Sequence, residues 1–182
     1  MLLNKKCILT LIASLTIFSG LVANAAVNSE VEAGAKILGA NLVDEVKFDE
    51  GKTILSDASK KDLQEIVKSA RAKGEISEIK VAVWSDKEYP TEDQKMPKQD
   101  VTMANARAQA VKDYLTKNLA VNDVNTYNMT ERPNPLQKFL NTSSYQTKST
   151  LEGSGAAPKK GDEGFLFTKA QKGKALLMVY LR

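Results

Sequence analysis

Three β-rich segments alternate with two helical segments between residues 46 and 129, and this order constrains the fold more than any other feature. Residues 79–84 (IKVAVW) form a short β-rich run, of the kind found in strands at the centre of a sheet. Apolar residues recur at helical spacing in the segments on either side. The expected elements are a strand at 46–50, a helix from Ser56 or Ser59 to Gly74, a strand at 79–84, a helix at 100–118 and a strand within 121–129.

A last strand is expected at residues 175–181 (ALLMVYL), because this apolar run suits a central position in the sheet. Two strand-helix-strand units imply right-handed crossovers. The sequence therefore predicts an α/β fold, a two-layer βαβαβ-β sandwich whose mixed sheet carries its helices on one face. We expect residues 26–43 to form a leader that packs on the domain, and residues 44–182 to form the domain itself.

The first 25 residues have the pattern of a cleaved secretory signal peptide. Lys5 and Lys6 precede an almost uncharged apolar stretch at 8–22, and residues 23–25 (Ala-Asn-Ala) suit a signal peptidase. The apolar stretch is shorter than the ~20 residues that cross a bilayer. We therefore expect a signal peptide at 1–25, an exported protein and no transmembrane segment after cleavage.

Rare and absent amino acids exclude several kinds of site. The 182 residues include no His and one Cys, Cys7, which lies in the expected signal peptide. These counts exclude a Ser-His-Asp triad, a His-ligated metal and an intrachain disulfide. The net charge of +4 falls to +2 when Lys5 and Lys6 are removed, which does not support nucleic-acid binding. No nucleotide-binding glycine motif is present. We expect no metal, no cofactor and no catalytic residue.

Two long loops interrupt the regular pattern. Pro90 and Pro97 prevent regular structure across residues 85–99. Residues 141–173 form an excursion rich in Gly, Ser and Thr, in which Phe165-Leu166-Phe167 suggests one ordered patch. A helical turn is expected before it, at 136–140.

Two charged residues lie where α/β sheets present ligand contacts. Asp86 follows the strand at 79–84, at its carboxyl end. Arg107 lies on the edge of the apolar stripe of the second helix, where a guanidinium needs an anionic partner. Spacing alone leaves two interpretations open. The residues form a ligand site, or Arg107 is structural, either snorkelling to solvent or pairing with Asp86.

Residues 105–115 (NARAQAVKDYL) resemble the helix signature of the OmpA-like C-terminal domain, the peptidoglycan-associating module of Gram-negative envelopes. Residues 46–50 (VKFDE) and 81–86 (VAVWSD) resemble the first two strands of that family, and Glu131 with its nearby prolines resembles the region after the third strand. The resemblance spans residues 43–181 and implies a non-enzymatic periplasmic binding module. The chain departs from the family at 83–89, which lacks two glycines, and at Lys174-Ala175, where the family carries two arginines.

The resemblance implies that the ligand is the diaminopimelate of the peptidoglycan stem peptide. Asp86 matches the aspartate that receives the ammonium of this amino acid, and Arg107 matches the arginine that holds its carboxylate. An anion and a cation at fixed separation select a zwitterionic group over a simple amine or acid. The residues expected on the rim of this site are Trp84, Ser85, Asp100 and Asn105.

Two alternatives remain. In the first, the OmpA-like fold has lost peptidoglycan binding and serves as a protein interaction module of the envelope, with the loops at 85–99 and 141–173 as its contact surface. In the second, carboxylates act in a hydrolase. The second has less support, because the acidic residues show no catalytic pattern.

Overall fold

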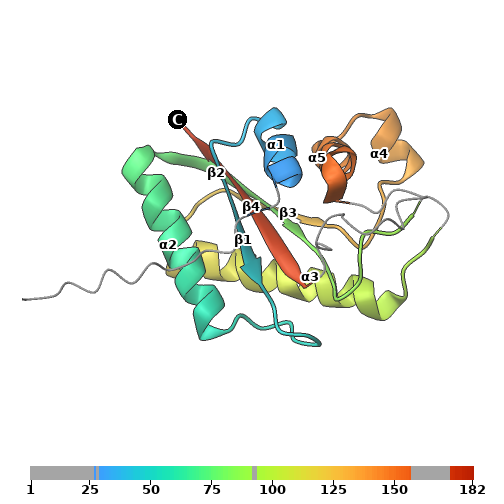
Figure 1. Ribbon diagram of the computed structural model, residues 1–182, viewed down its shortest axis with the longest axis horizontal. Coiled ribbons are helices and arrows are strands. Elements are labelled where there is room, and N and C mark those ends of the chain that lie inside the picture. The colour runs from blue at the N-terminus through green and yellow to red at the C-terminus, as the bar shows by residue number, and fades with distance from the viewer. Residues whose placement is uncertain (1–26, 28, 92–93, 157–172) are drawn as a thin grey trace, which may run out of the picture.

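The computed structural model describes residue 27 and residues 29–91, 94–156 and 173–182, and its sheet is centred on two largely apolar strands (Figure 1). The strands are β2 (Ile76–Val83) and β4 (Lys174–Leu181). Residues 175–179 of β4 are fully buried, so both faces of this strand are covered. Alternate residues of a strand point to opposite faces, so a continuous apolar run requires two covering layers.

The four strands of the described residues form one mixed sheet in the order β1-β4-β2-β3, with β1 at Leu42–Lys47 and β3 at Val124–Asn128. β4 is antiparallel to both β1 and β2, and β2 is parallel to β3. The carboxyl ends of β1 and β2 therefore lie at the same end of the sheet, beside the start of β4. The predicted α/β class, the mixed sheet and the central position of the last strand are confirmed.

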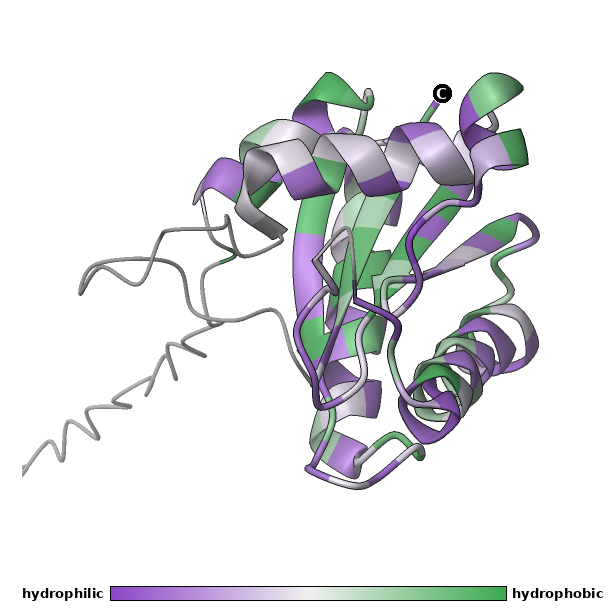
Figure 2. Ribbon diagram, turned by 90° about the vertical axis from the view of Figure 1, so that its right-hand side faces the viewer, coloured by the Kyte–Doolittle hydropathy of each residue, from purple (hydrophilic) through white to green (hydrophobic). Residues whose placement is uncertain are grey.

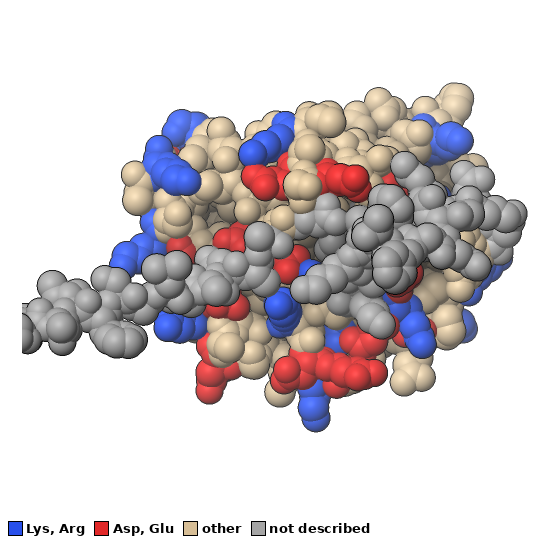
Figure 3. Space-filling model, in the orientation of Figure 1, with Lys and Arg blue, Asp and Glu red and all other residues tan. Residues whose placement is uncertain are grey.

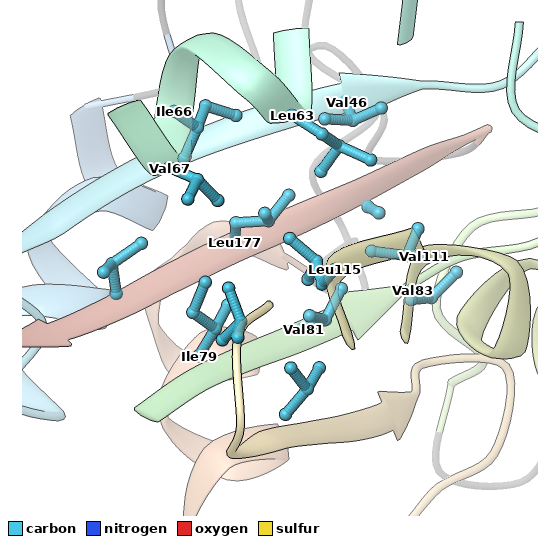
Figure 4. Close-up of a cluster of buried hydrophobic side chains, with 14 of the residues drawn as sticks. Val46, Leu63, Ile66, Val67, Ile79, Val81, Val83, Val111, Leu115 and Leu177 are labelled. Carbon is cyan, nitrogen blue, oxygen red and sulfur yellow. The ribbon is translucent and has the colours of Figure 1, made fainter. Parts of the chain in front are cut away.

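One face of the sheet is covered by α2 (Asp57–Lys73) and α3 (Lys98–Asp113), and α3 continues into the π-helical segment η1 (Tyr114–Asn118). The hydroxyl of Ser56 caps α2 by accepting a hydrogen bond from the Ser59 N–H, and Gly74 ends the helix, as the sequence predicts. Figure 4 shows the core on this face, with side chains of both helices meeting the strands. Its labelled residues are Val46, Leu63, Ile66, Val67, Ile79, Val81, Val83, Val111, Leu115 and Leu177.

The opposite face is also covered, by α1 (Ser29–Ile37) and α5 (Ser143–Leu151), so the expectation of helices on one face is wrong. Figure 2 shows helices on both sides of the apolar strands. Val31 and Ala35 of α1 and Leu151 of α5 pack with Leu176 and Met178. The physical reason is that β2 and β4 carry apolar side chains on both faces of the sheet, so a second helical layer has to bury the second face.

The leader and the excursion supply this second layer. The expected leader contains α1, which packs against the irregular turn η2 (Glu152–Ala156), and a Cβ added at Gly34 would lie 1.9 Å from Ser154 Oγ. The excursion contains α5, and the expected turn before it is α4 (Pro135–Phe139). The expected signal peptide and the patch at 165–167 lie outside the described residues. Among the described helices, none combines the length and apolarity that a membrane span requires.

Lys148 of α5 is a buried cation, with only 6% of its surface exposed. Its Nζ donates to the Glu131 carbonyl oxygen at 2.6 Å. Burial lowers the pKa of Lys148 to about 8, although the charge of Glu131 acts in the opposite direction. The folded state therefore favours the neutral amine more than the unfolded state does.

The lowered pKa of Lys148 predicts that the free energy of unfolding rises with pH in the alkaline range. Because its folded pKa lies below its unfolded value of about 10.4, the unfolded chain holds a proton that the folded chain has released between these values. From pH 7.5 to 9.5, the free energy of unfolding of the wild-type protein should gain on the order of 2 kcal/mol relative to Lys148→Met. Urea denaturation measures this difference. Lys68→Met, which changes an exposed lysine of α2, should parallel the wild type, and parallel curves for Lys148→Met would contradict the buried charge.

Candidate functional site

Arg107 of α3 is fully buried at the carboxyl end of β2. Its Nε donates to the Lys52 carbonyl oxygen at 2.7 Å, and its Nη1 donates to the Trp84 carbonyl oxygen at 3.1 Å. Its Nη2 donates to the Asp49 carbonyl oxygen at 3.1 Å. The Phe48 ring lies 5.0 Å from Cζ, within cation–π range. The guanidinium thus ties the segment after β1 to the end of β2.

Asp86 completes the set of acceptors around Arg107. Its Oδ1 accepts from Arg107 Nη2 at 2.7 Å, and its Oδ2 accepts from the Gly51 N–H at 2.6 Å. Gly51 has a φ of +69°, a conformation that favours glycine. Burial works against ionisation of Asp86, but the Gly51 N–H, the Arg107 guanidinium and the Lys87 charge outweigh it and lower the pKa of Asp86. The carboxylate is therefore fixed and ionised at neutral pH.

The structure brings Asp86 and Arg107 together but exposes them very differently. The side chain of Asp86 is 21% exposed, whereas that of Arg107 is 0% exposed. Four hydrogen bonds from Arg107 already go to this chain. Asp86 can accept a further contact from outside, while Arg107 can receive a ligand only if one of its present acceptors moves.

A pocket of about 260 Å³ opens beside Asp86. The volume lies slightly below the ~300–1,000 Å³ of sites for drug-sized ligands, so it suits an end group of a larger molecule. Gly173 lies at its wall, donates its N–H to the Ser85 carbonyl oxygen at 2.6 Å, and would place a Cβ 3.7 Å from Asp86 Oδ1. The lining residues are Lys47, Phe48, Glu50, Asp86, Gly173 and Lys174.

The four residues expected on the rim do not line this pocket. Trp84 and Ser85 are fully buried, and Trp84 packs in the core between the sheet and α1, so neither side chain can lie on an exposed rim. Asp100 is half-buried in the first turn of α3. Asn105 is exposed and accepts from Asn128 Nδ2 at 2.8 Å, on a different side of α3 from Arg107.

The pocket residues that the sequence did not indicate come from two distant segments, the end of β1 and the start of β4. Lys47 ends β1, and Phe48 and Glu50 come directly after it, in the segment VKFDE that carries the family resemblance. That segment was the available signal. Gly173 and Lys174 come from the start of β4, and only the antiparallel pairing of β1 with β4 brings them to the site.

The charges around the site are mixed. In Figure 3, acidic and basic side chains are interspersed over the visible face, which shows no broad basic patch that would attract a polyanion. Within the described ranges, no group of three or more acidic or Cys side chains is arranged to hold a metal ion. The site offers individual charged contacts to a small ligand group.

Replacing Arg107 should destabilise the fold more than replacing Asp86. Arg107→Met leaves three carbonyls without their donor and Asp86 without its counter-ion, so we expect a loss of about 3–5 kcal/mol in the free energy of unfolding. Asp86→Asn should cost about 2 kcal/mol, because part of the charge-assisted hydrogen bonding is lost. Urea denaturation at pH 7 measures both.

The effect of Asp86→Asn should disappear in acid. The folded pKa of Asp86 is lowered, so its contribution is present above the unfolded value of about 3.9 and is lost as the pH falls through the folded pKa. If Arg107→Met and Asp86→Asn lost equal free energies of unfolding at pH 7, the carbonyl contacts of Arg107 would contribute little.

Comparisons with known proteins agree with the residues that suggested the family. A family model described as "OmpA family" matches residues 47–134, a little under half of the chain. The chain has no significant match among curated proteins. Domains of the OmpA family belong to the cell envelope, typically bind peptidoglycan and are not enzymes.

Two solved structures are similar to the chain at low identity. One is the peptidoglycan-associated lipoprotein from Burkholderia pseudomallei, at 16% identity and a TM-score of 0.41, over 75% of this chain and 89% of that one. The other is the OmpA-like domain of FopA1 from Francisella tularensis subsp. tularensis SCHU S4, at 13% identity and a TM-score of 0.39, over 76% of this chain and 73% of that one. The similarity to the OmpA family rests on the family model, which covers residues 47–134 of this chain.

Proposed function

We propose that this protein is a non-enzymatic periplasmic module that associates non-covalently with peptidoglycan by holding the diaminopimelate of the stem peptide. The observation that carries the proposal is the Asp86 carboxylate. It is fixed by Gly51 and Arg107, is partly exposed and lies at the wall of a pocket that suits a small end group. The family match supports the same ligand class.

In this proposal, Asp86 accepts the ammonium of diaminopimelate. A carboxylate that is already oriented loses little freedom when the ligand binds, and its partial burial strengthens the interaction relative to bulk water. Glu50, an exposed acid at the same pocket, adds to the negative potential that attracts a cation.

The role of Arg107 in the proposal is first to position Asp86. A ligand carboxylate would reach its guanidinium by displacing the Asp49 carbonyl or one of the other acceptors. The segment from Asp49 to Lys52, which supplies two of these acceptors, would have to move for such a contact. Arg107 thus holds the anion in place before any ligand arrives.

Removal of the charge on Asp86 should weaken association with peptidoglycan. We expect Asp86→Asn to co-sediment with isolated sacculi about tenfold less well than the wild type, because the ammonium loses its charged acceptor. Added diaminopimelate should compete for the wild-type protein. Co-sedimentation over a range of sacculus concentrations gives both values.

The matched control is Asp123→Asn. Asp123 is exposed and precedes β3, at the opposite end of the sheet from Asp86. This variant should bind as the wild type does. Unchanged binding by a folded Asp86→Asn protein would refute the assignment of Asp86, and absence of wild-type binding would refute the peptidoglycan ligand itself.

A second candidate function is an envelope protein interaction module. Three apolar side chains on and beside α4 face solvent, with exposed fractions of 64%, 85% and 60% for Leu136, Phe139 and Leu140. Exposed apolar groups of this size often mark contact sites. Arg132, just before α4, donates to the Pro90 carbonyl oxygen at 2.7 Å and pairs with Glu152 at 2.6 Å, so the chain that leads into α4 contacts both long loops.

A photocrosslinker at position 139 tests this candidate. In cells, it should give one discrete adduct with an envelope protein, and a crosslinker at the exposed position 68 should not. Leu136→Ser should reduce the adduct at least threefold, while sacculus binding stays unchanged. No adduct at position 139, or the same adduct at both positions, would count against a specific partner on α4.

A further inference from the structure

Two lysines face each other at the open end of the sheet. Lys47, the last residue of β1, is the register partner of Lys174, the first residue of β4. Directly opposed residues of neighbouring strands point to the same face, and like charges in this arrangement destabilise the pair. Both lysines line the pocket beside Asp86.

The chain neutralises one of these lysines. Lys174 Nζ lies 2.8 Å from both carboxylate oxygens of Glu45, and this pair is largely buried. Lys47 is exposed and, within the described ranges, has no ion-pair partner. The pocket thus contains a cation whose repulsion with its neighbour is only partly compensated.

Arg107 is not accessible as a cation for a ligand carboxylate. It is fully buried and already donates to three carbonyls and to Asp86. Of the two lysines that line the pocket, Lys47 is therefore the one that a ligand can reach without breaking an ion pair within the described structure.

We propose that Lys47 binds the carboxylate of a zwitterionic amino acid end group whose ammonium lies on Asp86. This inference rests on the proposed function and deepens it by naming a residue that determines specificity. A bound carboxylate would offset the repulsion between Lys47 and Lys174. The two charged contacts come from different strand ends, so the pocket distinguishes a zwitterion from a diamine.

The Gly51 amide provides a direct probe. Its N–H donates to Asp86 Oδ2, so a cation that binds Asp86 should shift its NMR resonance whether or not Lys47 takes part. Titrations of the ¹⁵N-labelled full chain would use meso-diaminopimelate and 1,5-diaminopentane, which has two ammonium groups and no carboxylate. The variants are Lys47→Gln and the control Lys68→Gln.

We expect Lys47→Gln to weaken binding of diaminopimelate by roughly 3–10-fold, the range for loss of a charge-assisted contact near the surface. Binding of diaminopentane should be unchanged or tighter, because a repulsive charge has been removed. Lys68→Gln should alter neither affinity.

The possible failures are distinguishable. If Lys47→Gln leaves diaminopimelate affinity unchanged, or weakens both ligands equally, Lys47 is not the carboxylate contact, while the role of Asp86 stands. If neither ligand shifts the Gly51 amide of the wild-type protein, the Asp86 site is wrong and the Lys47 inference falls with it. Sacculus co-sedimentation then reports separately whether peptidoglycan binds elsewhere.

Discussion

The buried guanidinium of Arg107 organises one end of this protein. Three backbone carbonyls, from Asp49, Lys52 and Trp84, converge on it together with the carboxylate of Asp86. A buried arginine is costly to desolvate unless nearly all its donors are satisfied. The turn after β1 and the end of β2 supply those acceptors, so each segment is held by its contact with α3. The position of Asp86 at the wall of the pocket depends on this arrangement.

Much of the fold follows from periodicity. The helical stripe of α2, its Ser56 cap and its Gly74 terminus were visible in the sequence, as were the four strands and the central place of the last one. The second helical layer was missed, although the runs IKVAVW and ALLMVYL already required two covered faces. The sequence did not indicate which segments cover the second face, because α1 and α5 are short helices that are far apart in the chain and form a layer only by packing on β4.

The candidate site could be predicted in part. Asp86 follows a central strand and Arg107 faces the core, so their proximity could be inferred from spacing and from the family resemblance. The burial of Arg107 could not, because it depends on carbonyl groups, which every sequence contains and only a particular turn directs inward. The opposition of Lys47 and Lys174 depends on the register between β1 and β4, two strands that no hairpin turn connects.

The place of β4 has a consequence for how the domain assembles. β1 and β2 have no direct pairing with each other and meet only through β4, which is the last strand of the described sheet to be synthesised. Until it arrives, the earlier strands present unpaired backbone edges and two apolar faces to their surroundings. Folding is therefore dominated by contacts that are distant in sequence, a topology associated with slow folding and with dependence on protection from aggregation before completion.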